Sequence, residues 1–453
     1  MQNKNKVQDF MKFNPFMRLE ITFLFPHFVF TNLCLDPIMD KPPEIIDLAK
    51  IVEPHLENDG KLISYSSRYL TKPGDNYGSV MLSITAEIKH TNDGHTEKLP
   101  LVAKLPPLTN EMFWTLFNPV VTALRENAIY EKVSPSLRQL QLDSEIPESE
   151  IIDVFAKHYG CRISLDENAT ILDRNAVLVL ENLQISGYRP GNRRIMFDYD
   201  HTMLVLKYLA NFHALPIALR QKQPTKFHND IFSNFRRYDI SKEMTPEVET
   251  DFKEQVFEEV RQALGDDIKA YFRYLELVKM YHEFMGNPEE CEDGLFTTIA
   301  HYDLWTNNIM IKYDQFGAPD KLKIVDFQIT QYESLMHDLI FFLLTSVETS
   351  LVEDHFYVLL SCYYSEFIKC LERTKCKTDE YSFEKFLAEM ERIAPVQIHH
   401  AVFMARVLLA EETSLPEDFK DIDLAMLKKP PSTALLQKLR DIVRLAQKFE
   451  FFW

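Results

Sequence analysis

The segment TTIAHYDLWTNNIMIKYDQFGAPDKLKIVDFQ, residues 297–328, decides the fold that we expect for this 453-residue chain. An apolar run within it ends at His301, and a polar turn follows. Two runs of strand-forming residues, 309–313 and 321–325, come next and are separated by a turn that contains glycine and proline. Asp326 directly follows the second run. The segment therefore predicts a strand, a polar loop and a β-hairpin that ends at a carboxylate.

Three polar side chains of this segment have the chemistry that phosphoryl transfer needs: Asp303, Asn308 and Asp326. Phosphoryl transfer asks a protein mainly to position groups and to neutralise charge. Asp303 is placed to accept the hydrogen of an attacking hydroxyl group. The amide oxygen of Asn308 and the carboxylate of Asp326 are hard oxygen ligands, which Mg²⁺ prefers. His301 is better suited to orient the loop backbone than to titrate.

The order of these residues carries a resemblance to known phosphotransferases. The pattern H-x-D-x-x-x-x-N, followed by a hairpin and D-F, is shared by eukaryotic protein kinases and the choline kinase/aminoglycoside phosphotransferase group. The fuller string HYDLWTNNIM…IVDFQ most resembles the ecdysteroid kinase-like family, also called CHK kinase-like. That family usually has HGDLW-x-NN, so Tyr302 stands where glycine is common. The resemblance implies a bilobal, protein-kinase-like α+β fold with a small antiparallel-sheet N-lobe and a large, mainly helical C-lobe.

Composition excludes some classes of function. Hydrophobic residues make up 46% and charged residues 26% of the chain, as in an ordinary folded protein. The net charge of −18 argues against a nucleic-acid partner, because there is no general basic surface for a phosphate backbone. It does not argue against ATP, whose binding is local and metal-assisted. The six cysteines lack the spacing of a metal site, so we expect reduced thiols.

We expect three regions: a variable N-terminal extension at 1–41, a nucleotide-binding N-lobe at 42–183, and a helical C-lobe at 184–453. The C-lobe holds the catalytic loop and the acceptor pocket. Residues 21–35 are largely apolar and have the outline of a signal peptide. Pro26 interrupts this run, no small-residue cleavage site is recognisable, and the run is short for a membrane span. We therefore prefer an extension, a cytoplasmic location and no stable membrane insertion.

A lysine and a glutamate are the candidate charged pair of the N-lobe. Lys104 ends an apolar, strand-like run, and an unpaired buried ammonium is costly, so it should have an anionic partner. Phosphate oxygens and a helix carboxylate would both serve. The resemblance implies that Glu126 supplies this carboxylate, from a helix expected to begin near Asn118. A solvated face is an equally physical alternative for Glu126, because Arg125 and Glu131 compete as ordinary surface charges.

Two further stretches are candidates for nucleotide contacts. Strict alternation over 80–88 predicts a half-buried strand, and the turn before it ends at Gly78 and Ser79. Its backbone N–H groups would suit phosphates, although a plain hairpin would look the same. The family has a similar G-x-N-Y-x-S loop, matched here by Gly74, Asn76, Tyr77 and Ser79. The apolar strand at 176–183 resembles a kinase hinge, and its candidate adenine-binding residues are Leu180, Glu181 and Asn182.

The C-lobe sequence predicts mostly helices, in line with only 11 glycines. Asp200 is a candidate N-cap of a long apolar helix, and His213 near its end is expected to be a satisfied core histidine. Asp338 precedes the apolar run LIFFLLTSV. The resemblance implies that Asp338 supports the catalytic loop through hydrogen bonds, and helix capping is the alternative. The last helix, 432–450, should have one apolar face.

The sequence as a whole predicts an ATP- and Mg²⁺-dependent small-molecule kinase. The set Lys104, Glu126, Asp303, Asn308 and Asp326 is far more specific than any one member. No peptide-docking signature follows Asp326, which favours a small alcohol as acceptor. The resemblance implies an ecdysteroid hydroxyl, and the run after Asp338 would suit either a lipophilic pocket wall or the lobe core. A choline- or xenobiotic-type kinase and a non-catalytic small-molecule binding protein remain alternatives, and the oligomeric state is open.

Overall fold

The computed structural model describes most of the chain, with gaps. The described residues are 41–70, 79–92, 94–108, 114, 118–192, 194–236, 246–286, 294–409 and 430–451. The N-terminal extension expected at 1–41 lies almost wholly outside them, and so do Gly74, Asn76, Tyr77 and Gly78 of the expected phosphate-binding loop. Ser79 lies inside.

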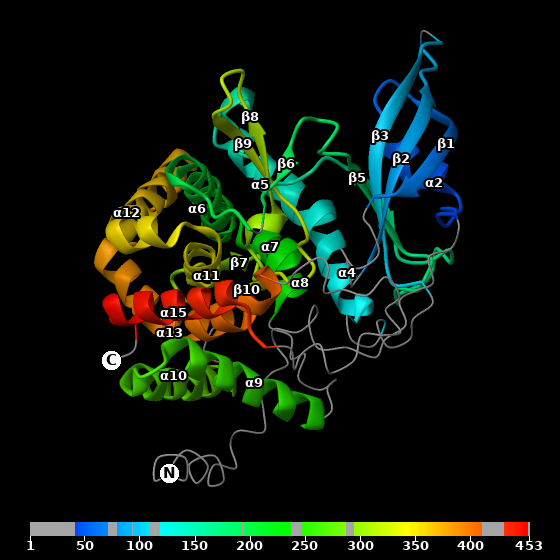
Figure 1. Cartoon of the computed structure of the whole chain (residues 1–453). Coiled ribbons are helices and arrows are strands. Elements are labelled where there is room, and N and C mark those ends of the chain that lie inside the picture. The colour runs from blue at the N-terminus through cyan, green and yellow to red at the C-terminus, as the bar shows by residue number, and fades with distance from the viewer. Residues whose placement is uncertain are drawn as a thin grey trace.

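A five-stranded antiparallel sheet forms one end of the molecule (Figure 1). The strand order is β1-β2-β3-β5-β4. The predicted alternation of buried and more exposed side chains at 80–88 is confirmed, because the even-numbered side chains from Leu82 to Ile88 are fully buried on one face of the sheet. The short helix α2 (Leu48–Val52) packs into the same core. The strands are β1 (Lys61–Tyr69), β2 (Val80–Lys89), β3 (Thr96–Leu105), β4 (His158–Arg162) and β5 (Val177–Glu181).

Helix α4 (Pro119–Ala128) links this sheet to the rest of the molecule. Proline at its start has the fixed φ that suits a first helical turn. The helix continues through a π-helical turn, Ile129–Val133, into α5 (Ser134–Asp143). Such π turns are frequent at functional sites.

The remainder is mainly helical, and the fold is therefore α+β (Figure 1). The long helices are α6 (Tyr199–Lys222), α9 (Pro246–Leu264), α10 (Ile268–Gly286), α11 (Met336–Ser346), α12 (Thr349–Arg373), α13 (Phe383–Leu408) and α15 (Thr433–Lys448). Helix α15 buries one apolar face, as its periodicity predicts. The N-cap prediction was wrong by two residues: Asp198, not Asp200, accepts a hydrogen bond from the His201 N–H, because α6 begins at Tyr199.

One described helix, α6, is long and apolar enough to cross a membrane by length and composition. It packs against α12 and β7, and 78% of its apolar window is buried inside the protein. Burial of this kind is typical of a core helix.

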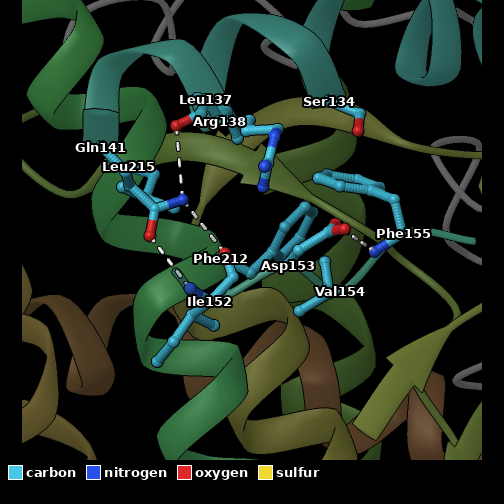
Figure 2. Close-up of a pocket in the computed structure, with 10 residues that line it drawn as sticks. All are labelled: Ser134, Leu137, Arg138, Gln141, Ile152, Asp153, Val154, Phe155, Phe212 and Leu215. Atoms are coloured by element: carbon cyan, nitrogen blue, oxygen red, sulfur yellow. Dashed lines mark hydrogen bonds between the residues drawn. The ribbon is translucent and has the colours of Figure 1, made fainter. Parts of the chain in front are cut away.

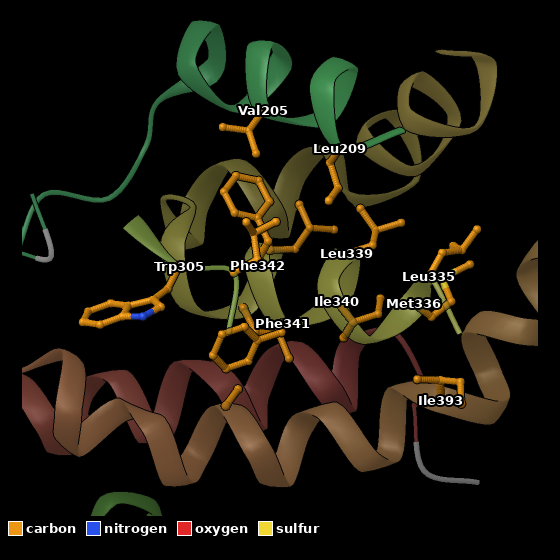
Figure 3. Close-up of a cluster of buried hydrophobic side chains, with 14 of the residues drawn as sticks. Val205, Leu209, Trp305, Leu335, Met336, Leu339, Ile340, Phe341, Phe342 and Ile393 are labelled. Carbon is orange, nitrogen blue, oxygen red and sulfur yellow. The ribbon is translucent and has the colours of Figure 1, made fainter. Parts of the chain in front are cut away.

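Helix α11 lies at the centre of the helical core (Figure 3). Val205 and Leu209 of α6 approach it from one side, and Ile393 of α13 from the other. Its residues from Leu339 to Leu344 are all buried. A helix that is buried on every side has no polar face, which explains the uninterrupted apolar sequence here. The run LIFFLLTSV therefore forms the core of the lobe and not an open pocket wall.

Two small sheets carry the central motif. Strands β7 (Thr297–Ala300) and β10 (Gln331–Ser334) pair with each other. Strands β8 (Ile309–Tyr313) and β9 (Pro319–Ile324) form the predicted hairpin, to which β6 (Arg189–Pro190) adds a third strand. Pro319 lies at the start of β9 and not in the turn, where the sequence had suggested it.

Candidate active site

Lys104, Glu126 and Asp326 meet although they come from three distant segments. Lys104 Nζ lies 2.7 Å from Glu126 Oε2 and 2.9 Å from Asp326 Oδ1. The lysine and glutamate side chains are only 10% and 3% exposed. Burial acts to lower the pKa of Lys104, but Asp326 and Glu126 outweigh it and hold that pKa above its ordinary value. The ammonium is therefore charged and bridges two carboxylates.

Glu126 also holds the backbone that follows Asp326. Its Oε1 accepts a hydrogen bond from the N–H of Phe327 at 3.3 Å. The solvated-face alternative for Glu126 is wrong, because the residue is 2% exposed. Its neighbour Arg125, expected to be an ordinary surface charge, is buried as well and donates to the carbonyls of Thr330 and Arg236. Helix α4 is thereby tied to the segment after Asp326 through two consecutive side chains.

Asp303 and Asn308 lie together in the loop between β7 and β8. Asn308 Nδ2 donates to the backbone oxygen of Asp303 at 2.9 Å and to its Oδ2 at 3.0 Å. The short 3₁₀ turn Thr306–Asn308 brings the two side chains together. Asp303 is 5% exposed. Burial, and next the charge of Asp326, raise the pKa of Asp303 well above its ordinary value, which suits a group that accepts a proton.

Asp338 stabilises the start of this loop through hydrogen bonds to its backbone. Its carboxylate accepts hydrogen bonds from the N–H groups of His301 at 2.6 Å and Tyr302 at 2.8 Å. His213 Nε2 lies 3.0 Å from the same carboxylate, and His213 Nδ1 lies 2.7 Å from the hydroxyl of Tyr363. Burial acts to raise the pKa of Asp338, but the His213 hydrogen bond and charge outweigh it and lower the pKa. The supporting role expected of Asp338 and the core role of His213 are both confirmed.

His301 orients the backbone, as the sequence suggested. Its Nε2 lies 3.0 Å from the carbonyl oxygen of Val325, and its Nδ1 accepts from the N–H of Asp303 at 3.3 Å. Since a carbonyl can only accept, the proton of the neutral ring is on Nε2. Burial lowers the pKa of His301, so the ring stays neutral.

Two non-glycine residues of the site have left-handed backbone conformations: Tyr302 at φ 73° and Asp326 at φ 67°. Such a conformation costs roughly 1–2 kcal/mol for a residue other than glycine. Aspartate tolerates it better than tyrosine does, because its short polar side chain can bond locally. This angle explains why the resemblance implies a glycine at position 302, and tyrosine there carries strain.

The expected adenine-binding residues end strand β5. The N–H of Glu181 donates to Lys157 at 2.9 Å, and the N–H of Asn182 donates to Pro100 at 3.3 Å. These two donors are used within the protein, and the carbonyl of Asn182 already accepts from the N–H groups of Ile185 and Ser186 at 3.0 and 3.1 Å. Leu180 is paired with Val102 in the sheet.

A small cavity lies beside the Lys104–Glu126 pair. Ser79, the described end of the expected phosphate-binding loop, lines it together with Asn127 and Gln328. Both amides are more than nine-tenths buried. Neither residue is a candidate from the sequence, because a lone asparagine or glutamine has no diagnostic spacing.

A second small cavity lies between α5 and α6, and its lining residues have a structural role (Figure 2). The side-chain amide of Gln141 accepts from the N–H of Ile152 and donates to its carbonyl, each at 3.0 Å. This fixes the segment that continues to Val154, whose carbonyl accepts from the N–H of Ile324 at 2.7 Å. Ile324 is the last residue of β9, the strand that leads to Asp326. The cavity therefore belongs to the packing that positions this aspartate.

The donor set fits a magnesium ion held jointly with phosphates. The described residues contain no group of three or more His, Cys, Asp or Glu side chains arranged around a metal. Mg²⁺ usually takes only one or two carboxylates from a protein and completes its shell with water and phosphate oxygens. Asp326 and the side-chain oxygen of Asn308 match that pattern, and the backbone bond from Val325 N to Asn308 O, 3.0 Å, keeps their segments together.

The α+β fold, with a lysine–glutamate pair beside a buried Asp-x-x-x-x-Asn loop and a following aspartate, defines a kinase-like protein. The model of the ecdysteroid kinase-like family matches residues 73–376, which is more than half of the chain. The chain belongs to this family. A comparison with curated proteins found no match.

The Lys104–Glu126 pair should behave as one unit in a double-mutant cycle. We expect Lys104→Met and Glu126→Gln to be strongly non-additive in kcat/KM for ATP, because each leaves the other's charge buried and without one of its partners. The surface pair Lys61–Glu53, at 2.8 Å but with the lysine 60% exposed, is the matched control and should be nearly additive. Additive losses at Lys104 and Glu126 would show that they act independently.

Proposed function

We propose that this protein is an ATP-dependent small-molecule kinase that transfers the γ-phosphate of ATP to a hydroxyl group of a lipophilic alcohol, such as an ecdysteroid or a related steroid. The observation that carries this proposal is the contact of Lys104 with both Glu126 and Asp326. A buried ammonium with two carboxylates has little value for stability alone, since such clusters repay their desolvation poorly. It has a clear use as a phosphate and metal site.

The chain's own residues divide the chemistry among them. Bound MgATP would supply the phosphoryl group and neutralise charge as it moves. Asp303 takes the proton of the acceptor hydroxyl at its carboxylate, and Asn308 keeps that carboxylate in place through Oδ2. Asp326 and Asn308 would hold the metal, and Lys104 would bind phosphate oxygens while Glu126 keeps its ammonium oriented. Asp338 fixes the loop on which Asp303 lies.

The segment after Asp326 and the family membership support a small alcohol as the acceptor. Strand β10 and helix α11 follow Asp326 almost at once, which leaves little chain for docking a peptide and favours a small molecule. Membership in the ecdysteroid kinase-like family supports a steroid alcohol. The apolar run after Asp338 does not add to this, because it lies in the core. Chemistry that depends on ATP also favours a cytoplasmic location.

The acceptor class can be tested with a panel of alcohols. We expect Mg²⁺-dependent ATP consumption to rise saturably with an ecdysteroid and to stay at background with choline, because a large apolar acceptor gains affinity on leaving water. Xenobiotic alcohols of similar hydrophobicity form the third arm. Phosphorylation of choline, with none of ecdysteroids or other apolar alcohols, would overturn the acceptor and leave the kinase chemistry standing. Tight MgATP binding without turnover of any alcohol would favour a non-catalytic binding protein.

A further inference from the structure

Tyr302 has an unusual position for a large side chain. It is the residue between His301 and the proposed base Asp303, its backbone is left-handed at φ 73°, and it is 4% exposed. Its ring lies 4.9 Å from the ring of His337 and 6.2 Å from the ring of His400, centroid to centroid. His337 belongs to α11 and His400 to α13. The catalytic loop therefore contacts two helices of the lobe through one side chain.

The residues around this ring form a directed chain of hydrogen bonds. His400 Nδ1 lies 3.0 Å from Gln397 Oε1, an acceptor, so the histidine nitrogen donates. The Nε2 of the same glutamine donates to His337 Nδ1. The opposite nitrogen of His337 then faces Glu333 on β10, at 3.8 Å. The hydrogen bonds thus link α13 to α11, and the His337–Glu333 contact brings α11 close to the strand that pairs with β7.

This cluster is buried. Gln397 and His337 are 1% exposed and Glu333 is fully buried. The ring of His400 also stacks on Phe341 of α11, with centroids 4.3 Å apart and planes inclined by 17°. Burial lowers the pKa of His400 to about 3, so its ring stays neutral and keeps the donor role described above. Interiors packed in this way pass displacements on and do not absorb them.

We propose that Tyr302 is a positioning residue that couples the catalytic loop to helix α13 through His337, Gln397 and His400. Asp338 fixes the loop through its backbone N–H groups, and the Tyr302 ring fixes it through the contact with His337. The strained backbone of Tyr302 persists because both contacts hold it. The orientation of Asp303 then depends on where α13 lies. Its consequence for turnover rests on the proposed function, but the coupling itself does not.

Amide hydrogen exchange tests the coupling without nucleotide or acceptor. Gln397→Ala removes the link in the middle of the chain, between His400 and His337. In the otherwise unchanged protein, it should accelerate exchange of the loop amides at 301–303 by on the order of 10-fold, the effect expected of members of one network. In a Tyr302→Gly background, the same change should have almost no further effect on these amides. Glu391→Ala, at an exposed position of α13, is the control and should leave them unchanged.

Tyr302→Phe separates the ring from the hydroxyl group. It keeps the ring against His337 and His400, so it should retain the loop protection of the native sequence. Equal acceleration by Gln397→Ala in both backgrounds would overturn the proposal, and so would acceleration spread over the whole helical lobe. If the protein also turns over ATP, Tyr302→Gly should lower kcat and leave KM for ATP nearly unchanged. A loss of coupling in exchange therefore stays distinguishable from a failure of the kinase assignment.

Discussion

Replacement of Asp303 by asparagine should lower phosphotransfer by about 10²- to 10⁴-fold, the usual value of a general base. Asparagine has the same shape, and its side-chain oxygen can still accept the hydrogen bond that Asn308 donates at 3.0 Å. It cannot take a proton from the acceptor hydroxyl. MgATP affinity should stay nearly unchanged, because the charged groups assigned to phosphate and metal are Lys104 and Asp326. Initial rates and calorimetric titration with MgATP on the same preparation measure the two effects.

The same substitution should not weaken the fold. Burial raises the pKa of Asp303 in the folded protein above its value in the unfolded chain. The folded state therefore binds more protons between these two pKa values, and stability falls as pH rises through that window. Asparagine removes this loss, so at neutral pH Asp303→Asn should have a Tm equal to or above that of the native sequence. Turnover that is undiminished in a folded variant would contradict the role of Asp303 as base.

Replacement of Asp326 by alanine should remove most of the metal-dependent affinity for ATP. We expect this affinity to fall by at least about 10-fold. Mutation of a residue that only hydrogen-bonds to a metal ligand already lowers metal affinity by this factor. The native carboxylate lies 2.9 Å from Lys104 Nζ, and bound Mg²⁺ would weaken this contact, because the ion and the ammonium attract the same carboxylate, while Lys104 keeps Glu126. Titrations with ATP in Mg²⁺ and in EDTA isolate the metal-dependent part.

The control for this experiment is Asp320→Ala, because Asp320 is an exposed carboxylate on β9, the strand that leads to the same aspartate. It should bind MgATP like the native protein. Asp303→Asn, as a second comparison, should lose far less affinity than Asp326→Ala. Equal MgATP affinity in the native protein and in Asp326→Ala would show that Asp326 is not a metal ligand.

The sequence was informative wherever a physical requirement acts on one residue or on a short period. The alternation at 80–88 predicted strand β2, and the cost of a buried ammonium predicted an anionic partner for Lys104, which the structure supplies twice. The resemblance of the segment at 297–328 led to the α+β kinase-like fold and to the family. The fold and the charged set therefore followed from local patterns plus one recognisable motif.

The remaining errors concern contacts between residues far apart in the chain. Arg125 has the appearance of a surface charge because its partners are carbonyl groups at Thr330 and Arg236, and any residue provides a carbonyl. The run after Asp338 could have been a pocket wall or a core helix, since both need the same apolar residues. The left-handed backbone of Asp326 had no sequence signal, and that of Tyr302 was visible only as a departure from glycine.

The proposed transfer of phosphate from ATP to an alcohol is tested by following the phosphate itself. Purified protein is incubated with Mg²⁺, an ecdysteroid and ATP labelled in its γ-phosphate, and the products are separated by chromatography. We expect label in the steroid, dependent on Mg²⁺ and lost in Asp303→Asn. Label that reaches no alcohol of the panel, from a protein that binds MgATP and is correctly folded, would contradict the proposed transfer.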